Sequence, residues 1–108
     1  LALAPETKNI ISKKELGLLK STSIIINTAR GELIDTGALI DALKSKKIAG
    51  AGLDVIANVE KSHSLLKFDN VVLSPHSGWW TRESIKNQAE IIVQNIEAFA
   101  KGKPINIV

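Results

Sequence analysis

Three apolar runs divide the chain, and the stretches around them carry apolar residues at helical spacing. The runs span residues 23–27, 48–55 and 70–74, and residues 38–43 between the first two place apolar side chains on one helical face. Strands that alternate with helices are typical of a parallel sheet joined by crossover helices. The sequence therefore predicts an α/β fold of three or so parallel strands with flanking helices and a long carboxyl-terminal helix.

Helix start and stop signals frame the predicted helices. Ser12, with Glu15 three residues later, is a capping-box pattern that opens a short helix. Asp35 and Thr81 are each placed to cap a further helix, and Gly102 stops the last one. These signals predict three helices whose amino-terminal residues can be named.

The strands also carry local signals. The β-branched run within residues 23–27 is typical of a strand buried on both faces, as parallel sheets require. Gly50 and Gly52 within residues 48–55 indicate that another segment packs closely against this strand. A short helix is expected at residues 62–67, before the third strand.

Composition narrows the function classes. The chain has 108 residues and no cysteine, so neither a disulfide framework nor a thiolate metal site is possible. We expect no metal site, and a cytoplasmic protein, because cysteine-free chains suit a reducing compartment. No apolar run reaches the roughly 20 residues that span a bilayer, so no membrane partner is expected. The net charge is +3, but only four aromatic residues are available to stack on bases, so no nucleic-acid partner is expected.

A polar residue with useful chemistry follows each predicted strand. Arg30, Asp54 and His76 come after the first, second and third strand respectively. Ligands of open α/β sheets bind outside the carboxyl ends of the strands, so these side chains are expected at one site. Gly31 would let the backbone approach a ligand closely. His63, in a polar turn, is read as a surface residue.

The three residue types suit reduction of a 2-keto acid. A guanidinium grips a carboxylate through two parallel hydrogen bonds, and an imidazole near its neutral pKa can protonate a carbonyl oxygen. A carboxylate from Asp54 or Glu60 would orient the imidazole. The plainer alternatives are that Arg30 is a solvated surface charge and that His76 is structural. Hydrolysis is disfavoured, because the sequence shows no activated nucleophile.

Four segments carry a family resemblance. They are LAPETKNII at 3–11, NTARGELID at 27–35, GAGLDV at 50–55 and SPHSG at 74–78. In order and spacing they resemble the D-isomer-specific 2-hydroxyacid dehydrogenases. The resemblance implies the second half of a Rossmann-type parallel sheet in the NAD-binding domain, with residues 1–4 as the tail of a preceding strand.

The same resemblance implies roles for individual residues. Arg30 would bind the substrate carboxylate and His76 would be the acid/base, both beside the cofactor. Asp54 would contact the nicotinamide carboxamide, with Thr28 and Ala29 lining the nicotinamide site. Gly78, at the end of the fourth segment, is expected at the cofactor site, and Glu60 is expected to pair with the histidine.

The sequence departs from the family pattern in two places. Glu60 stands one residue later than the family's glutamate and is followed by Lys61 instead of proline, while Val59 occupies the usual spacing. No Gly-x-Gly-x-x-Gly loop occurs, so the pyrophosphate cradle is missing from these residues. We therefore expect 1–108 to be a partial dinucleotide-binding domain, a fragment without the glycine-rich half and the substrate domain.

Two functions stay open at this point. The first is the carboxyl-terminal portion of an oxidoreductase that uses NAD, or NADP, on a small 2-keto or 2-hydroxy acid and is inactive as an isolated chain. The second is a non-catalytic dinucleotide-sensing or interaction protein on the same fold. In either case residues 23–27 would form an exposed apolar edge strand, which favours association. We expect the parent protein to be a homo-oligomer, such as a dimer.

Overall fold

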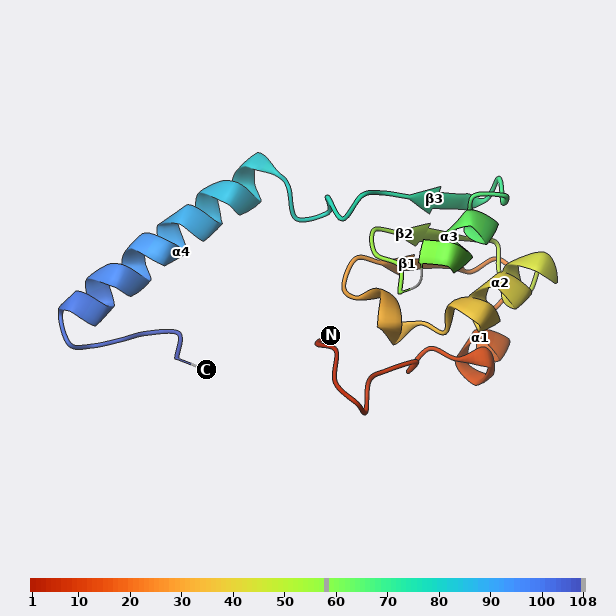
Figure 1. Cartoon of the computed structure of the whole chain (residues 1–108), viewed down its shortest axis with the longest axis horizontal. Coiled ribbons are helices and arrows are strands. Elements are labelled where there is room, and N and C mark those ends of the chain that lie inside the picture. Colours follow the sequence, from red (N-terminus) through yellow and green to blue (C-terminus); the bar gives the residue numbers. More distant parts are fainter. Residues whose placement is uncertain (58, 108) are drawn as a thin grey trace. The chain divides into compact units, whose positions relative to one another are not determined.

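The described residues form eight elements of secondary structure. The computed structural model describes residues 1–57 and 59–107, and it divides the chain into two units, Leu1–Ser77 and Gly78–Val108. The elements, in chain order, are α1 (Lys13–Leu18), β1 (Ile24–Asn27), the 3-10 helix η1 (Gly31–Leu33), α2 (Thr36–Lys44), β2 (Gly50–Leu53), α3 (Val59–Leu65), β3 (Val71–Leu73) and α4 (Arg82–Ala100). Figure 1 labels the helices and strands.

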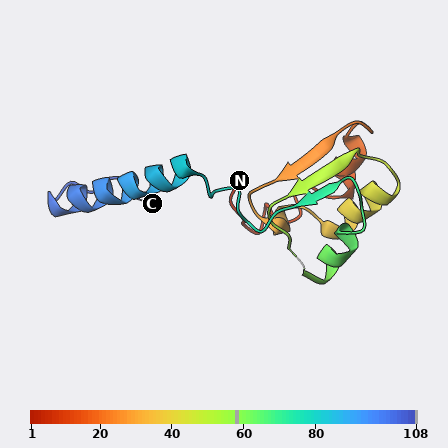
Figure 2. The same cartoon turned by 90° about the horizontal axis from the view of Figure 1, so that it is seen from above.

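The first unit contains the predicted parallel sheet. Its strands lie in the order β1-β2-β3, and both neighbouring pairs are parallel. The register places Ile26 beside Gly52, and Gly52 beside Val72. The prediction of an α/β fold with parallel strands is confirmed. The carboxyl ends of all three strands lie at one edge of the sheet (Figure 2).

Helices α1, α2 and α3 lie on one side of this sheet, as Figures 1 and 2 both show. The side chains of Ile24, Ile26 and Val72 on the strands are 65%, 73% and 70% exposed. The expectation that residues 23–27 form a strand buried on both faces is therefore wrong for this chain. Helices α1, α2 and α3 cover one face of this sheet (Figures 1 and 2). The expected apolar edge strand is confirmed, because within the described residues β1 has β2 as its single neighbour in the sheet.

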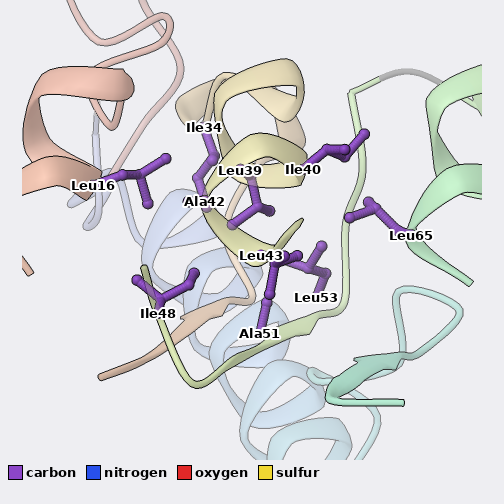
Figure 3. Packing of buried hydrophobic residues seen from close by; sticks show 10 residues of the cluster. All are labelled: Leu16, Ile34, Leu39, Ile40, Ala42, Leu43, Ile48, Ala51, Leu53 and Leu65. Atoms are coloured by element: carbon purple, nitrogen blue, oxygen red, sulfur yellow. The ribbon is translucent and has the colours of Figure 1, made fainter. Parts of the chain in front are cut away.

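The core lies between the sheet and these helices. Figure 3 shows its ten buried apolar residues, which come from every layer. Leu16 of α1, Leu39 of α2 and Leu65 of α3 are among its most deeply buried side chains, together with Ile48 before β2. Replacing such a leucine by alanine costs about 2–5 kcal/mol of stability. This packing fixes the helices against the sheet and so fixes the loops that leave the strands.

The predicted helix caps are present. The Ser12 hydroxyl accepts from the Lys14 amide, and the Glu15 carboxylate accepts from the Ser12 amide at 3.0 Å. One Asp35 carboxylate oxygen accepts from two amides of α2. Each cap satisfies amide groups that have no partner within the helix. The capping-box and Asp35 predictions are thus confirmed.

Several element boundaries differ from the prediction. The second strand is shorter than the expected 48–55, because β2 spans Gly50–Leu53. The helix expected at 62–67 begins earlier, because α3 spans Val59–Leu65 and brings Glu60 into its first turn. Residues 1–4, expected as the tail of a strand, have no regular secondary structure. A turn at residues 5–9 follows them, and Ile11 forms an isolated parallel bridge with Ile34.

The second unit is dominated by α4. The Thr81 hydroxyl caps it by accepting from the Ser84 amide at 3.1 Å, as predicted. At its end Gly102 has φ +69, and its amide donates to the Phe99 carbonyl. Glycine reaches this left-handed conformation without a steric penalty, so Gly102 ends the helix as expected. Within the described residues, no helix combines the length and apolar character that crossing a membrane requires.

Candidate functional site

The carboxyl ends of the three strands are joined by main-chain hydrogen bonds. The Asp54 amide donates to the Asn27 carbonyl at 2.9 Å, and the His76 amide donates to the Asp54 carbonyl at 3.0 Å. These bonds tie the residues just past β1, β2 and β3 into one continuous edge. The sequence expectation that the three strand ends form one locus is therefore confirmed for their backbones.

Arg30 lies on a tight turn that leaves β1. The side chain of Asn27, the last residue of β1, accepts from the Ala29 amide at 3.0 Å and donates to the Arg30 carbonyl at 2.8 Å. The Arg30 guanidinium is exposed, and its Nη1 donates to the Ala29 carbonyl at 2.7 Å. Thr28, the first residue after β1, is also exposed. The turn therefore presents a cation and a hydroxyl at the sheet edge.

Gly31 is buried directly behind this turn. A Cβ at this position would overlap the Ala57 amide nitrogen and the Ile56 carbonyl carbon, and would lie 2.8 Å from the Ile56 Cα. The close approach expected here for a ligand is thus made by the chain's own loop after β2. Gly31 lets this loop pack against the arginine turn.

Asp54 is one of two buried polar side chains among the described residues, with 5% of its surface exposed. Its Oδ1 accepts from the Ser77 amide at 2.9 Å and from the Ser74 hydroxyl. A buried carboxylate is costly unless it is well hydrogen-bonded, and these bonds offset that cost. Asp54 therefore holds both ends of the segment that contains His76.

His76 has a left-handed backbone, with φ 55, and an exposed side chain. Histidine is one of the few non-glycine residues enriched in this region. Sparsely populated backbone conformations persist where the surroundings hold them, and they cluster at functional sites. Here the hydrogen bonds that Asp54 makes to the amides of His76 and Ser77 supply that support.

The remaining residues considered in the sequence are Glu60, Gly78 and His63. Glu60 is exposed on α3, and the described part of the chain shows no hydrogen bond or ion pair between Glu60 and His76. Gly78 is the first residue of the second unit. His63 is exposed on α3, in agreement with its reading as a surface residue. The assignments of Glu60 and Gly78 stay predictions.

Comparison with known proteins identifies the family. The sequence profile described as "D-isomer specific 2-hydroxyacid dehydrogenase, NAD binding domain" matches residues 1–78. The chain belongs to this family. It is 49% identical over 108 residues to a glyoxylate reductase of Thermococcus litoralis, and 42% identical over 110 residues to a glycerate dehydrogenase of Methylorubrum extorquens. In each case 98% of this chain is covered.

Solved structures of this dehydrogenase family share the fold. The chain is similar to the D-isomer specific 2-hydroxyacid dehydrogenase of Lactobacillus delbrueckii ssp. bulgaricus in its NAD complexed form, with a TM-score of 0.89 and 40% identity. It is also similar to an acyclic imino acid reductase in complex with NADPH and D-Arg, with a TM-score of 0.92 and 35% identity. Both comparisons cover 100% of this chain and 38% and 35% of those chains. The chain thus spans about a third of the length of its relatives.

Sequence reasoning missed two side chains that hold the loops at the strand ends. Asn27 was read as the end of an apolar strand, and Ser74 as part of the strand before His76. One signal was available for Asn27. It lies two residues after Ile25, so in a strand it shares the face of an apolar residue. An amide at such a position needs internal hydrogen-bond partners.

Proposed function

We propose that the protein containing this chain reduces small 2-keto acids to 2-hydroxy acids with a nicotinamide cofactor, and that residues 1–77 form one wall of its active site. The observation that carries the proposal is the pair of hydrogen bonds that joins Asn27, Asp54 and His76 at one sheet edge. These bonds bring a guanidinium turn and an imidazole loop to the place where open α/β sheets bind ligands. The family membership supports this chemistry.

Arg30 is the proposed anchor for the substrate carboxylate. Its guanidinium is exposed and already forms a hydrogen bond with one carbonyl oxygen. A planar guanidinium binds a carboxylate through two parallel hydrogen bonds, which fixes orientation as well as affinity. The anchor places the 2-keto carbon in a defined position relative to the turn.

His76 is the proposed acid/base. During reduction its imidazolium donates a proton to the carbonyl oxygen, and in the reverse direction the neutral ring accepts the proton from the hydroxyl. Asp54 fixes the backbone on either side of the ring through the amides of His76 and Ser77. Glu60 is the proposed partner of the ring, a role that requires α3 to bring its carboxylate to His76.

The residues present fit one end of a nicotinamide cofactor. Thr28 and Ala29 offer a hydroxyl and a small side chain on the turn, and Asp54 offers a buried carboxylate beside it. These residues, with Gly78, would hold the nicotinamide, which supplies a hydride when bound. The sequence of residues 1–108 has no glycine-rich loop for a pyrophosphate. We therefore propose that 1–108 is part of a dinucleotide-binding domain whose other half binds the rest of NAD or NADP.

A steady-state assay tests this function. The complete product of the reading frame that encodes residues 1–108 is purified, its intact mass is compared with the mass calculated from that frame, and it is assayed with glyoxylate and NADH or NADPH. We expect turnover, and we expect Arg30→Lys to raise the KM for glyoxylate about 10-fold or more with little change in the KM for the cofactor, because one lysine nitrogen replaces a two-pronged contact. Lys44→Ala, at the carboxyl end of α2, is the charge-removal control and should leave both constants unchanged.

The alternative is a non-catalytic dinucleotide-sensing protein on the same fold, which the position of Glu60 favours. It predicts that the complete protein binds NADH in a fluorescence titration but reduces no 2-keto acid. Turnover that depends on Arg30 excludes this alternative. Cofactor binding without turnover would instead overturn the proposed enzymatic function.

A further inference from the structure

The described chain has two buried polar side chains, Asn27 and Asp54, which are 7% and 5% exposed. Burying an amide costs free energy unless its donor and acceptor groups find partners. Asn27 finds both of its recorded side-chain partners within three residues, on the turn that carries Arg30. The Asn27 amide thus serves the turn rather than a distant part of the core.

The position of Asn27 in β1 explains why this arrangement is rigid. Along β1 the exposed side chains of Ile24 and Ile26 alternate with the half-buried Ile25 and the buried Asn27. Asn27 is therefore held on the packed face of the sheet, under the turn that follows it. Its main-chain carbonyl also accepts from the Asp54 amide, so its backbone is fixed to β2.

The Asn27 side chain is the acceptor in one hydrogen bond with the main chain of the turn and the donor in the other. Oδ1 accepts from the Ala29 amide at 3.0 Å, and Nδ2 donates to the Arg30 carbonyl at 2.8 Å. Together they fix the peptide group between Thr28 and Ala29 and the peptide group between Arg30 and Gly31, and so hold the main chain of Arg30 from both sides. An exposed arginine side chain is flexible, so its reach depends on where this main chain is placed.

We propose that Asn27 is a positioning residue, which holds the Arg30 turn so that the guanidinium meets the substrate carboxylate. This inference rests on the proposed function of Arg30 and adds the residue that sets its geometry. Asn27 itself is buried and touches no reacting atom. Its effect on the reaction must therefore disappear when Arg30 no longer makes its two-pronged contact.

A double-mutant cycle tests the proposal in the complete protein. The KM for glyoxylate and the kcat are measured for wild type, Asn27→Ala, Arg30→Lys and the double variant. We expect Asn27→Ala to lower kcat/KM about 10- to 100-fold, mainly through the KM for glyoxylate, because misplacing a binding group by about 1 Å has effects of this size. In the Arg30→Lys background the same change should have little further effect, as coupled residues are non-additive.

Two further variants keep the test decisive. Asn70→Ala removes another asparagine whose Nδ2 donates to a carbonyl, that of Ala49, at the opposite end of the strands, and should leave the KM unchanged. Asn27→Ser introduces a hydroxyl that can still accept from the Ala29 amide but does not reach the Arg30 carbonyl. It should give an intermediate KM, and it replaces Asn27→Ala in the cycle if that variant does not fold.

The outcomes separate this proposal from the function on which it rests. If wild type turns over glyoxylate, Arg30→Lys is impaired, and the Asn27 effect is equal in both backgrounds or absent, the positioning role alone is overturned. If wild type reduces no 2-keto acid, or Arg30→Lys is unimpaired, the proposed function fails and the positioning role fails with it. A loss of kcat/KM that Asn27→Ala causes in the wild-type background but not in the Arg30→Lys background supports both the proposed function and the positioning role.

Discussion

Replacing Gly31 by alanine tests the packing behind the arginine turn. The added Cβ would overlap the main chain of Ile56 and Ala57 and would lie 2.8 Å from the Ile56 Cα. Carbon atoms in contact prefer separations of about 3.5–4.0 Å, so main-chain segments must separate by about 1 Å. Neither segment is the free end of a flexible side chain.

The expected size follows from two opposing effects. Overpacking a buried position costs about 1–3 kcal/mol. Alanine also restricts the unfolded chain, which stabilises the fold by about 0.4–1 kcal/mol. The difference between the middles of these two ranges predicts that Gly31→Ala lowers the free energy of unfolding by about 1 kcal/mol.

Gly17→Ala is the matched control. Gly17 lies within α1, and apart from its chain neighbours and the helix's own backbone no atom lies within 4 Å of the position that a Cβ would take. Alanine is favoured over glycine in a helix, so the same substitution should raise the free energy of unfolding by about 0.5–1 kcal/mol. Urea unfolding of both variants of the complete protein, followed by circular dichroism, measures the two signs. A Gly31→Ala variant as stable as wild type would refute the packing argument.

Three further predictions concern stability and are measured by the same unfolding method. Lys46 follows α2 with φ 54, a left-handed conformation that costs a non-glycine residue about 1–2 kcal/mol. Lys46→Gly should therefore raise the free energy of unfolding by up to about 1 kcal/mol, and an unchanged or lower value would contradict this. Hydrogen bonds from Ser12 lower the pKa of Glu15, so they stabilise the fold above the unfolded pKa, and this stability is lost as pH falls through the folded pKa. In Glu15→Gln the free energy of unfolding should therefore fall less steeply with falling pH than in wild type, and an equally steep fall would count against this account. Asp54→Ala leaves the Ser77 amide without its partner and should lower the free energy of unfolding by about 1–3 kcal/mol. Asp54→Asn keeps an acceptor oxygen and should cost less, so equal losses in the two variants would be inconsistent with the hydrogen-bond account.

The sheet could be predicted from sequence because local and global signals agree. The β-branched run of β1, the Asp35 cap and the apolar face of α2 all indicate strand–helix alternation, and parallel strands then bring their carboxyl ends together. The strand-end residues Arg30 and Asp54 could therefore be assigned to one edge from the sequence.

The rest depended on distances that a sequence does not encode locally. The roles of Asn27 and Ser74 arise from hydrogen bonds whose geometry is set by the turn and by the end of β2. Gly31 was assigned to a ligand because a pattern cannot say which backbone approaches it, and the neighbour is the loop after β2. The exposure of Ile26 was missed because a β-branched run does not show which face the helices cover.

The central claim, that the strand-end edge is catalytic, is tested most directly by a substitution of His76 that its left-handed backbone tolerates. Asparagine also tolerates this conformation, so His76→Asn removes the imidazole while preserving the loop. The measurement is the kcat for glyoxylate of the complete protein and of this variant, with equal unfolding midpoints as the control. We predict that kcat falls by about 10²–10⁴-fold, the usual contribution of a general acid/base. An unchanged kcat in the folded variant would contradict the account.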